Sequence, residues 1–219
     1  INIFSDYQIA CSKIAAVALF GETELEKPKT KVIPNAIYLN KFDPQIYNKK
    51  DVLDKFDSSN STYRLLNVGR FVEAKNHKFL LEIVYELGKL ESNFKLFLVG
   101  HGKYEIDIKK MINNYELQEY VEILPQSTNV AEILSITDAM IFPSLYEGFG
   151  TVAIEAQAMN VPVFITDSDE VSKDTQLGLC YFFPLEDGAK YWAESIYKYL
   201  QNSTNFQNKL YRSEERRVG

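Results

Sequence analysis

The fold is decided by residues 61–100, STYRLLNVGRFVEAKNHKFLLEIVYELGKLESNFKLFLVG. This stretch begins with a short apolar segment, Arg64–Val68, passes through a polar loop, and ends with a second apolar segment, Lys95–Val99. With Asn76 as a candidate cap, the residues between them repeat apolar side chains at the spacing of one helix face: Phe79, Leu80, Ile83, Val84 and Leu87. The pattern predicts two parallel strands joined by a covering helix.

The same alternation continues toward the carboxyl end. A second helix face contains Ile108, Met111, Ile112 and Tyr115, and the further strand candidates are Val121–Leu124, Ala139–Phe142, Val161–Ile165 and Leu179–Phe182. Strands that are apolar on both faces and alternate with amphipathic helices favour a Rossmann-like α/β fold, in which helices cover both faces of a parallel sheet. Ligands of such sheets bind at the carboxyl ends of the strands, so the loops there are the candidate sites.

The pattern before this sheet is less regular. Tyr7–Cys11 is a strand candidate, and Ser12 is the candidate N-cap of a helix that ends at Phe20. Residues 34–60 are rich in Pro, Asn and Lys, with one helical turn expected near Val52–Phe56. We therefore predict four parts: a domain remnant (1–33), a linker and surface loop (34–60), a main domain (61–205) and a tail (206–219).

Composition excludes several classes of protein. With 46% hydrophobic residues in 219, the chain can bury a sizeable core, and its net charge of −6 disfavours a nucleic-acid-binding function. The longest apolar run, Ile14 to Phe20, is far shorter than the roughly 20 residues of a membrane span. The two cysteines, Cys11 and Cys180, lie far apart and are expected to be buried thiols in a reducing cytosol.

The last eight residues differ in composition from the rest. Residues 1–211 contain 19 Lys and 2 Arg, whereas RSEERRVG at 212–219 contains 3 Arg and no Lys. This octapeptide can be encoded by AGATCGGAAGAGCGTCGTGTAGGG, which resembles a short-read sequencing adaptor. We expect residues 212–219 to be non-native, and the chain, which starts at Ile1 without Met, to be a fragment at both ends.

Two loops that follow the first strands carry candidate chemistry. The loop from Gly69 to Asn76 places Arg70 and Lys75, here named the cation pair, on a turn before a helix, which suits an anion such as a diphosphate. The second loop is Gly100-His101-Gly102, whose glycines either let a ligand approach the backbone or make a tight turn. Either loop alone is a common surface feature.

A third loop, Pro143 to Gly150, leads into another helix. If that helix begins near Gly150, the helix dipole and four converging amides can hold a phosphate: those of Gly148, Phe149, Gly150 and Thr151. Glu147 precedes this point, and Glu155 follows about two turns later, so both carboxylates can accept hydrogen bonds from sugar hydroxyls. A capped helix with two solvated acids explains this loop equally well when it is taken alone.

Together the segments resemble a known family. VGRFVEAKNH (68–77), LVGHG (98–102) and FPSLYEGFGTVAIEAQA (142–158) are similar to the nucleotide-sugar half of family 4 retaining glycosyltransferases of the GT-B fold. Glu147 and Glu155 match the Glu-x7-Glu signature of that family. Residues 1–33 resemble the end of its acceptor-side domain, KVIPNAIYLNKF (31–42) resembles the interdomain crossover, and the most similar subgroup makes bacterial capsular and exopolysaccharides.

The resemblance implies a role for each matching residue. Arg70 and Lys75 would neutralise the leaving diphosphate, Glu147 would contact the transferred sugar, and Leu124-Pro125-Gln126 would frame the base. The full donor site implied is Gly69, Gly100, Leu124, Pro125, Gly148, Phe149, Gly150, Thr151 and Glu155. The resemblance also implies a UDP-sugar donor, no metal ion, and a glycan or lipid-linked acceptor that binds mainly to the missing N-terminal domain.

Two further expectations follow from the resemblance, and the sequence departs from the family pattern in two places. The enzyme would be cytoplasmic, with peripheral association at the inner face of the membrane. The isolated chain would bind the donor weakly and transfer little sugar. Ala36 and Tyr38 depart from the usual Gly and Asp of the crossover, and LPQS (124–127) departs from the usual base loop.

Other interpretations remain open at this point. A GT-B-fold nucleotide-sugar isomerase of the UDP-N-acetylglucosamine 2-epimerase type would need more than the two histidines present, His77 and His101. A non-catalytic nucleotide-binding module is a further alternative; its natural candidate, a dinucleotide-binding domain, would need a G-x-G-x-x-G motif after the first strand, which is lacking. Asp167-Ser168-Asp169 matches a metal-binding DxD motif, which we discount because nothing around it resembles that fold. Trp192 is expected to pack in the core.

Overall fold

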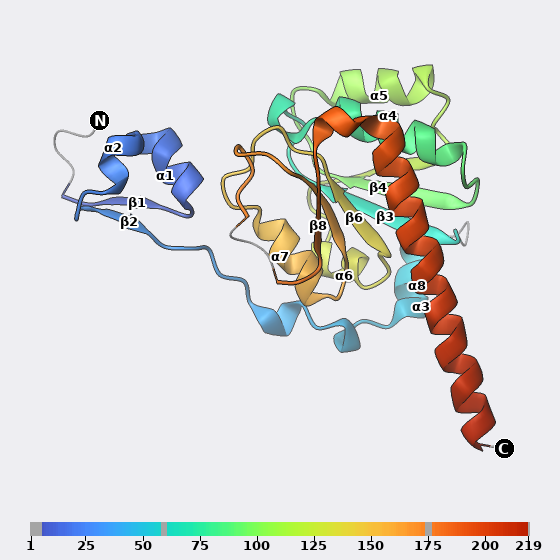
Figure 1. Ribbon diagram of the computed structural model, residues 1–219. Helices are drawn as coiled ribbons and strands as arrows, with labels where there is room; N and C mark the ends of the chain where they lie inside the picture. Colours follow the sequence, from blue (N-terminus) through green and yellow to red (C-terminus); the bar gives the residue numbers. More distant parts are fainter. Residues whose placement is uncertain (1–5, 58–60, 174–176, 219) are drawn as a thin grey trace.

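A computed structural model describes residues 6–57, 61–173 and 177–218, with side chains described as far as Ser203. At its centre lies a six-stranded parallel sheet in the order β5-β4-β3-β6-β7-β8 (Figure 1). The strands are β3 (Tyr63–Val68), β4 (Phe94–Val99), β5 (Val121–Leu124), β6 (Ala139–Phe142), β7 (Val163–Thr166) and β8 (Cys180–Phe183). The predicted parallel sheet is confirmed, and no strand boundary differs from the prediction by more than two residues.

Helices cover both faces of this sheet because alternate residues of each strand point to opposite sides. In β3, Leu65 packs in one core cluster and Leu66 in the other, and both are fully buried. The first cluster includes residues of α4 (His77–Gly88), α5 (Glu105–Asn114) and α8 (Gly188–Val218). The second includes residues of α3 (Lys49–Phe56), α6 (Val130–Leu134) and α7 (Thr151–Ala158).

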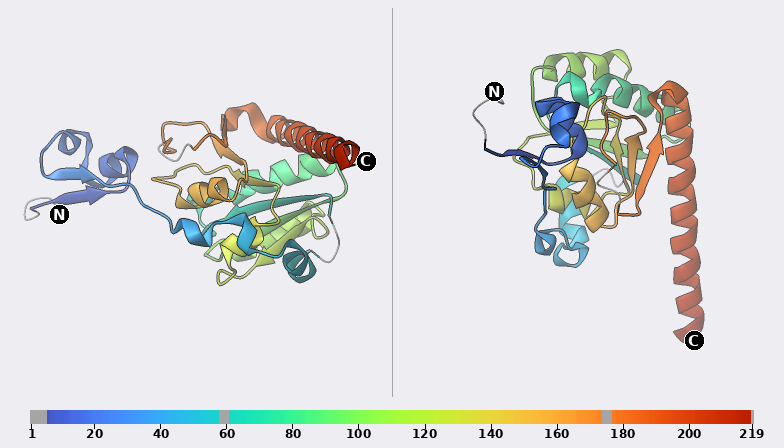
Figure 2. Two further views of the ribbon diagram at one scale, coloured as in Figure 1. Left: turned by 90° about the horizontal axis from the view of Figure 1, so that it is seen from below. Right: turned by 60° about the vertical axis from the view of Figure 1, so that its left-hand side comes forward.

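The start of the described chain forms a separate small unit beside this sheet (Figures 1 and 2). Its strands β1 (Gln8–Ala10) and β2 (Thr30–Val32) pair in parallel, and α1 (Lys13–Phe20) and α2 (Glu22–Leu25) connect them along the chain. As predicted, Ser12 caps α1, because its Oγ accepts a hydrogen bond of 3.0 Å from the amide of Ala15. Gly21 follows α1 with a φ of 92°, a conformation that favours glycine.

The segment predicted as linker and surface loop is more ordered than expected. It contains two short 3-10 turns, Leu39–Lys41 and Pro44–Ile46, and all of α3. Asn48 caps α3, and Val52 is buried against the sheet. The helix was predicted as a single turn because so few of its residues are apolar, and tertiary packing of that one face compensates for the weak local signal.

Two other predictions concern single side chains. Trp192 is fully buried, as predicted, and its Nε1 donates to the carbonyl of Pro184 at 2.9 Å. The cysteines were predicted to be buried, which is wrong: Cys11 and Cys180 are free thiols that are only half-buried. Cys180 opens the edge strand β8, which has a neighbour on one side only, and its partial burial still raises the pKa of the thiol to about 11.

Two predictions concern the ends and membrane insertion. Within the described residues, no helix is both long enough and apolar enough to span a bilayer. Of the suspected non-native residues 212–219, only the backbone to Val218 is described, as part of α8, and the start at Ile1 lies outside the described residues.

Candidate functional site

The first two predicted loops meet through their backbones at the carboxyl ends of β3 and β4. The amide of Phe71 donates to the carbonyl of His101 at 2.8 Å, and the amide of Tyr104 donates to the carbonyl of Phe71 at 3.1 Å. A Cβ atom on Gly100 would lie 2.0 Å from the carbonyl oxygen of Gly69, and one on Gly102 would lie 2.6 Å from that of Phe71. The glycines are therefore needed for close contact between the loops.

The first and third loops are joined by an ion pair. Lys75, at the end of a 3-10 turn after β3, forms a short hydrogen bond and ion pair with Oε2 of Glu147, which follows β6. The ammonium also lies 4.5 Å from the ring centre of Phe142, the buried last residue of β6. The two charged side chains are 20% and 15% exposed, so solvent screens this pair less than a surface pair.

Glu147 also contacts the start of α7. Its Oε1 accepts a hydrogen bond of 2.9 Å from the amide of Gly150, the N-cap residue of that helix. Gly150 has a φ of 69°, in the left-handed region that glycine adopts most easily. The predicted helix start near Gly150 is confirmed, and one of the amides expected to face a phosphate is bonded to Glu147 in this structure.

Main-chain hydrogen bonds hold the third loop on two sides. On one side the amide of Leu145 donates to the carbonyl of Ala74 at 2.9 Å. On the other, the amide of Glu147 donates to the carbonyl of Glu170 at 2.9 Å, and the carbonyl of Glu147 accepts from Ser172 at 2.9 Å. These bonds give Glu147 a defined position before any ligand arrives.

The small N-terminal unit also contacts the site. The Ser12 hydroxyl donates a short hydrogen bond to the carbonyl of Gly148, while its oxygen caps α1. In the crossover segment, the Asn35 side chain donates to Oγ1 of Thr151 at 3.4 Å, at the first turn of α7. Segments far apart in the chain therefore meet at this helix start.

The remaining predicted residues differ in burial. Arg70 is exposed at the edge of the site, and no ion pair is recorded for it among the described residues. Glu155 is half-buried in α7, and burial raises the pKa of its carboxyl above the usual value. The side chain of Phe149 is buried in the structure, so of its atoms only the main chain is suited to a ligand.

The loop predicted to frame a base borders a hollow of about 620 Å³. Leu124, Pro125 and Gly100 line it, and the amide of Gly100 donates to the carbonyl of Leu124 at 3.3 Å. Glu105 and Lys109 of α5 complete one wall. The structure thus brings Gly69, Gly100, Leu124 and Pro125 to one end of the sheet.

One prediction about a side chain near the site needs correction. Asn76 occupies the N-cap position of α4, but its side chain forms no capping bond, because the preceding 3-10 turn forces it into a left-handed conformation with φ of 51°. Asp167 of the discounted DxD motif pairs with Lys173. In the part of the chain that is described, no cluster of three His, Cys, Asp or Glu side chains suits a metal ion.

Sequence reasoning missed several contacts of the site. The position of Phe142 beneath Lys75 and the backbone contact of Glu170 with Glu147 depend on which strands are neighbours. Ser12 was recognised as a helix cap, but its second bond to Gly148 spans 136 residues of sequence. Contacts between residues so far apart cannot be predicted from local sequence patterns.

Known proteins resemble this chain in sequence and in fold. The family profile described as glycosyl transferases group 1 matches residues 48–216. The putative glycosyltransferase EpsF of Bacillus subtilis strain 168 is 33% identical over 189 residues, which are 85% of this chain and 49% of EpsF. The capsular polysaccharide biosynthesis glycosyltransferase CapH of Staphylococcus aureus is 30% identical over 137 residues, which are 61% of this chain and 38% of CapH.

A solved structure gives the same result for the fold. Anabaena HepE, crystallised with UDP and glucose, superposes with a TM-score of 0.76 at 19% identity, covering 92% of this chain and 55% of HepE. The chain spans between about a third and about half of the length of the curated relatives it matches. The fold is that of one half of a GT-B glycosyltransferase, and the chain belongs to the glycosyl transferases group 1 family.

Proposed function

We propose that this chain is the donor-binding half of a retaining family 4 glycosyltransferase. The complete enzyme would transfer a sugar from a UDP-sugar to a glycan or lipid-linked acceptor during synthesis of a bacterial surface polysaccharide. Membership of the group 1 family and the similarity to CapH support this proposal. The single observation that carries it is the Lys75–Glu147 pair, which places a cation and a carboxylate together at the start of α7.

In this proposal the cation pair stabilises the leaving diphosphate. Lys75 would exchange the Glu147 carboxylate for phosphate oxygens, and the exposed Arg70 would add a second positive charge. Negative charge grows on the diphosphate as its bond to the sugar breaks, so fixed cations stabilise the transition state more than the bound donor. Glu147, released from Lys75, would then accept hydrogen bonds from hydroxyls of the transferred sugar.

The rest of the donor would extend along the edge of the sheet. The amides at the start of α7 would hold the phosphates, and Glu155 would accept hydrogen bonds from the ribose hydroxyls. The hollow beside Leu124 and Pro125 is large enough for a nucleobase. HepE was crystallised with UDP, which supports uridine as the base of the donor.

The acceptor side belongs to the other half of the enzyme in this proposal. Residues 1–33 would be the end of an acceptor-binding domain, so the isolated chain would bind UDP weakly and transfer little sugar. The complete enzyme would work in the cytoplasm, with peripheral contact at the inner face of the membrane. The prediction that residues 212–219 are non-native stays open to a direct test by sequencing genomic DNA beyond Tyr211.

We also propose that no metal ion takes part, because the cation pair supplies the positive charge that a divalent ion supplies elsewhere. UDP affinity should then be the same in EDTA and in Mg²⁺ at equal ionic strength. Binding that requires Mg²⁺ would contradict this part of the proposal. The complete enzyme with its N-terminal domain should show the same independence in a transfer assay.

Calorimetric titration of UDP into the wild type and Arg70→Ala tests the donor site. Loss of one charge-assisted contact should weaken UDP binding by about tenfold to a hundredfold. Lys110→Ala, which removes an exposed cation of α5 that is not part of the proposed donor site, is the charge-matched control and should bind like the wild type. Equal affinities for wild type and Arg70→Ala would refute the assignment, and binding of NAD in place of UDP would favour a dinucleotide module.

A further inference from the structure

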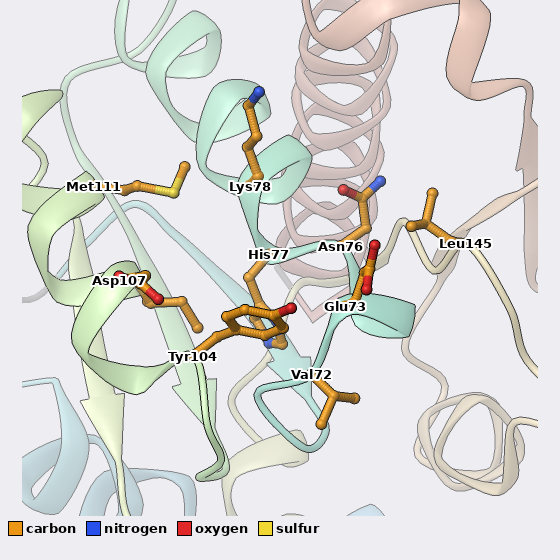
Figure 3. Close-up of a pocket in the computed structure, with 10 residues that line it drawn as sticks. Val72, Glu73, Asn76, His77, Lys78, Tyr104, Asp107, Met111 and Leu145 are labelled. Carbon is orange, nitrogen blue, oxygen red and sulfur yellow. The ribbon is translucent and has the colours of Figure 1, made fainter.

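A separate apolar hollow of about 300 Å³ lies between α4, α5 and the first loop (Figure 3). Val72 and Leu145 border it from the first and third loops, while Tyr104, Ile108 and Met111 line the side toward α5. The hollow that frames the proposed base site shares none of these residues. The proposed donor function therefore leaves this hollow unexplained.

His77 lines this hollow and carries a buried polar atom. His77 is only 5% exposed, and Nε2 of its imidazole has no hydrogen-bond partner among the described residues. The ring of Phe71 contacts the imidazole edge to face with centres 4.9 Å apart, which fixes its orientation. A buried polar atom without a partner is costly, so this atom points to a partner supplied from outside the chain.

The charges around the hollow select against an anion. Burial, together with the nearby Lys75, lowers the pKa of His77 to about 4, so the imidazole is uncharged at neutral pH. Glu73 and Asp107 add carboxylates to the rim, and Lys78 adds one ammonium group. An uncharged ligand avoids both the cost of burying a charge and repulsion from the two carboxylates.

We propose that this hollow binds an uncharged, mainly apolar ring that carries one hydrogen-bonding group directed at Nε2 of His77. The walls suit a ring because Tyr104 offers an aromatic face and the Met111 thioether packs well on aromatic groups. Leu145 connects the hollow to the proposed donor site, since its amide bonds to Ala74, the residue before Lys75. The proposal does not require that the chain binds a nucleotide.

Phenol and toluene are matched probes for this site, since they have nearly the same shape and differ in one hydroxyl group. Phenol should bind in a saturable manner and about fivefold to tenfold more tightly than toluene, the value of roughly one net hydrogen bond. The chain has three methionines, so methyl NMR reports the location directly. The Met111 signal should shift, while those of Met140 and Met159, in the opposite core cluster, should not.

The two histidines supply a second readout. Phenol should shift the imidazole nitrogen signals of His77 and leave those of the exposed His101 unchanged. His77→Phe keeps the ring contact with Phe71 but removes Nε2, so it should lose the preference for phenol and bind toluene at least as tightly, since the buried hydroxyl would then lack a partner. Equal affinity of the wild type for both probes, or shifts at Met140, Met159 or His101 in place of Met111 and His77, would overturn the proposal. The wild-type measurements decide the matter even if His77→Phe does not fold.

Discussion

Lys75 is paired with Glu147 across two loops that follow neighbouring strands, and the same carboxylate bonds to the amide of Gly150. One side chain of the pair thus occupies the helix start that the proposed function assigns to phosphate, and it holds the cation that the phosphate would need. In the structure, the charges of Lys75 and Glu147 therefore neutralise each other. Donor binding in this scheme is an exchange of one anion for another.

The stability of this pair can be measured by a double-mutant cycle. Lys75→Met should lower the free energy of unfolding by about 2 kcal/mol, because it leaves a largely buried carboxylate without its cation. Adding Glu147→Gln should recover part of that loss, a coupling of about 1 kcal/mol or more. Urea unfolding followed by Trp192 fluorescence gives both values. The pair Lys89–Glu86, whose lysine is exposed, is the matched control, and its removal should change the stability much less because solvent screens it. Simple additivity at Lys75 and Glu147 would contradict the prediction.

Two glycines that face each other should respond differently to alanine. Gly100→Ala would place Cβ 2.0 Å from the carbonyl oxygen of Gly69, and we expect a loss of about 3 kcal/mol or more because backbone must move. Gly69→Ala would place Cβ 3.4 Å from the flexible Lys75 side chain, which can adjust. Its melting temperature should therefore stay much closer to that of the wild type. Similar losses in the two variants would show that the loops do not meet as described.

Stability should depend on pH through His77. Because burial lowers the pKa of the folded state to about 4, the unfolded chain binds a proton more readily between that value and 6.5. The contribution of His77 to the free energy of unfolding is therefore complete above pH 6.5. It is lost as the pH falls toward 4, and the total loss is about 3 kcal/mol. Urea unfolding at several pH values should show a shallower slope in His77→Phe than in His101→Phe. Parallel pH profiles for the two variants would contradict this assignment.

Glu155 offers a test of the ribose contact in the proposed donor site. Glu155→Gln keeps the size of the side chain but replaces one strong acceptor oxygen, so it should discriminate less between UDP and its 2′,3′-dideoxy analogue. The wild type should prefer UDP by about tenfold or more, since hydrogen bonds to a charged group contribute about 1.5–3 kcal/mol. Calorimetry with both ligands gives the ratio for each protein. An unchanged ratio in Glu155→Gln would remove Glu155 from the ribose site.

The sheet was predictable because strands covered on both faces leave continuous apolar runs, as Ala139–Phe142 shows. One strand begins later than predicted. The sequence predicts a strand at Val161–Ile165, but β7 begins at Val163, because Pro162 has no amide hydrogen to donate to the neighbouring strand. The predicted loops did gather at one end of the sheet.

The details of the site were less predictable. The Lys75–Glu147 pair depends on β6 lying next to β3, a neighbour from much later in the chain, and the strand order is not readable from local patterns. The sequence left two explanations for Gly100, the approach of a ligand to the backbone or a tight turn. The structure gives a third, because a side chain at Gly100 would collide with the backbone of the neighbouring loop. His77 lies in the first turn of α4, behind the predicted cap Asn76, but the lack of a hydrogen-bond partner for its Nε2 is a property of tertiary packing.

The close contact between the loops at 69–71 and 100–102 involves main-chain atoms. The side chains of Arg70, His101 and Lys103 are exposed around it and take no part in those backbone bonds. The glycines therefore fix the backbone of the two loops, and the three exposed side chains can be replaced without disturbing that backbone. At Arg70 such a replacement would still weaken UDP binding in the proposed function. Charge at the mouth of the site could be redesigned there without rebuilding the scaffold beneath it.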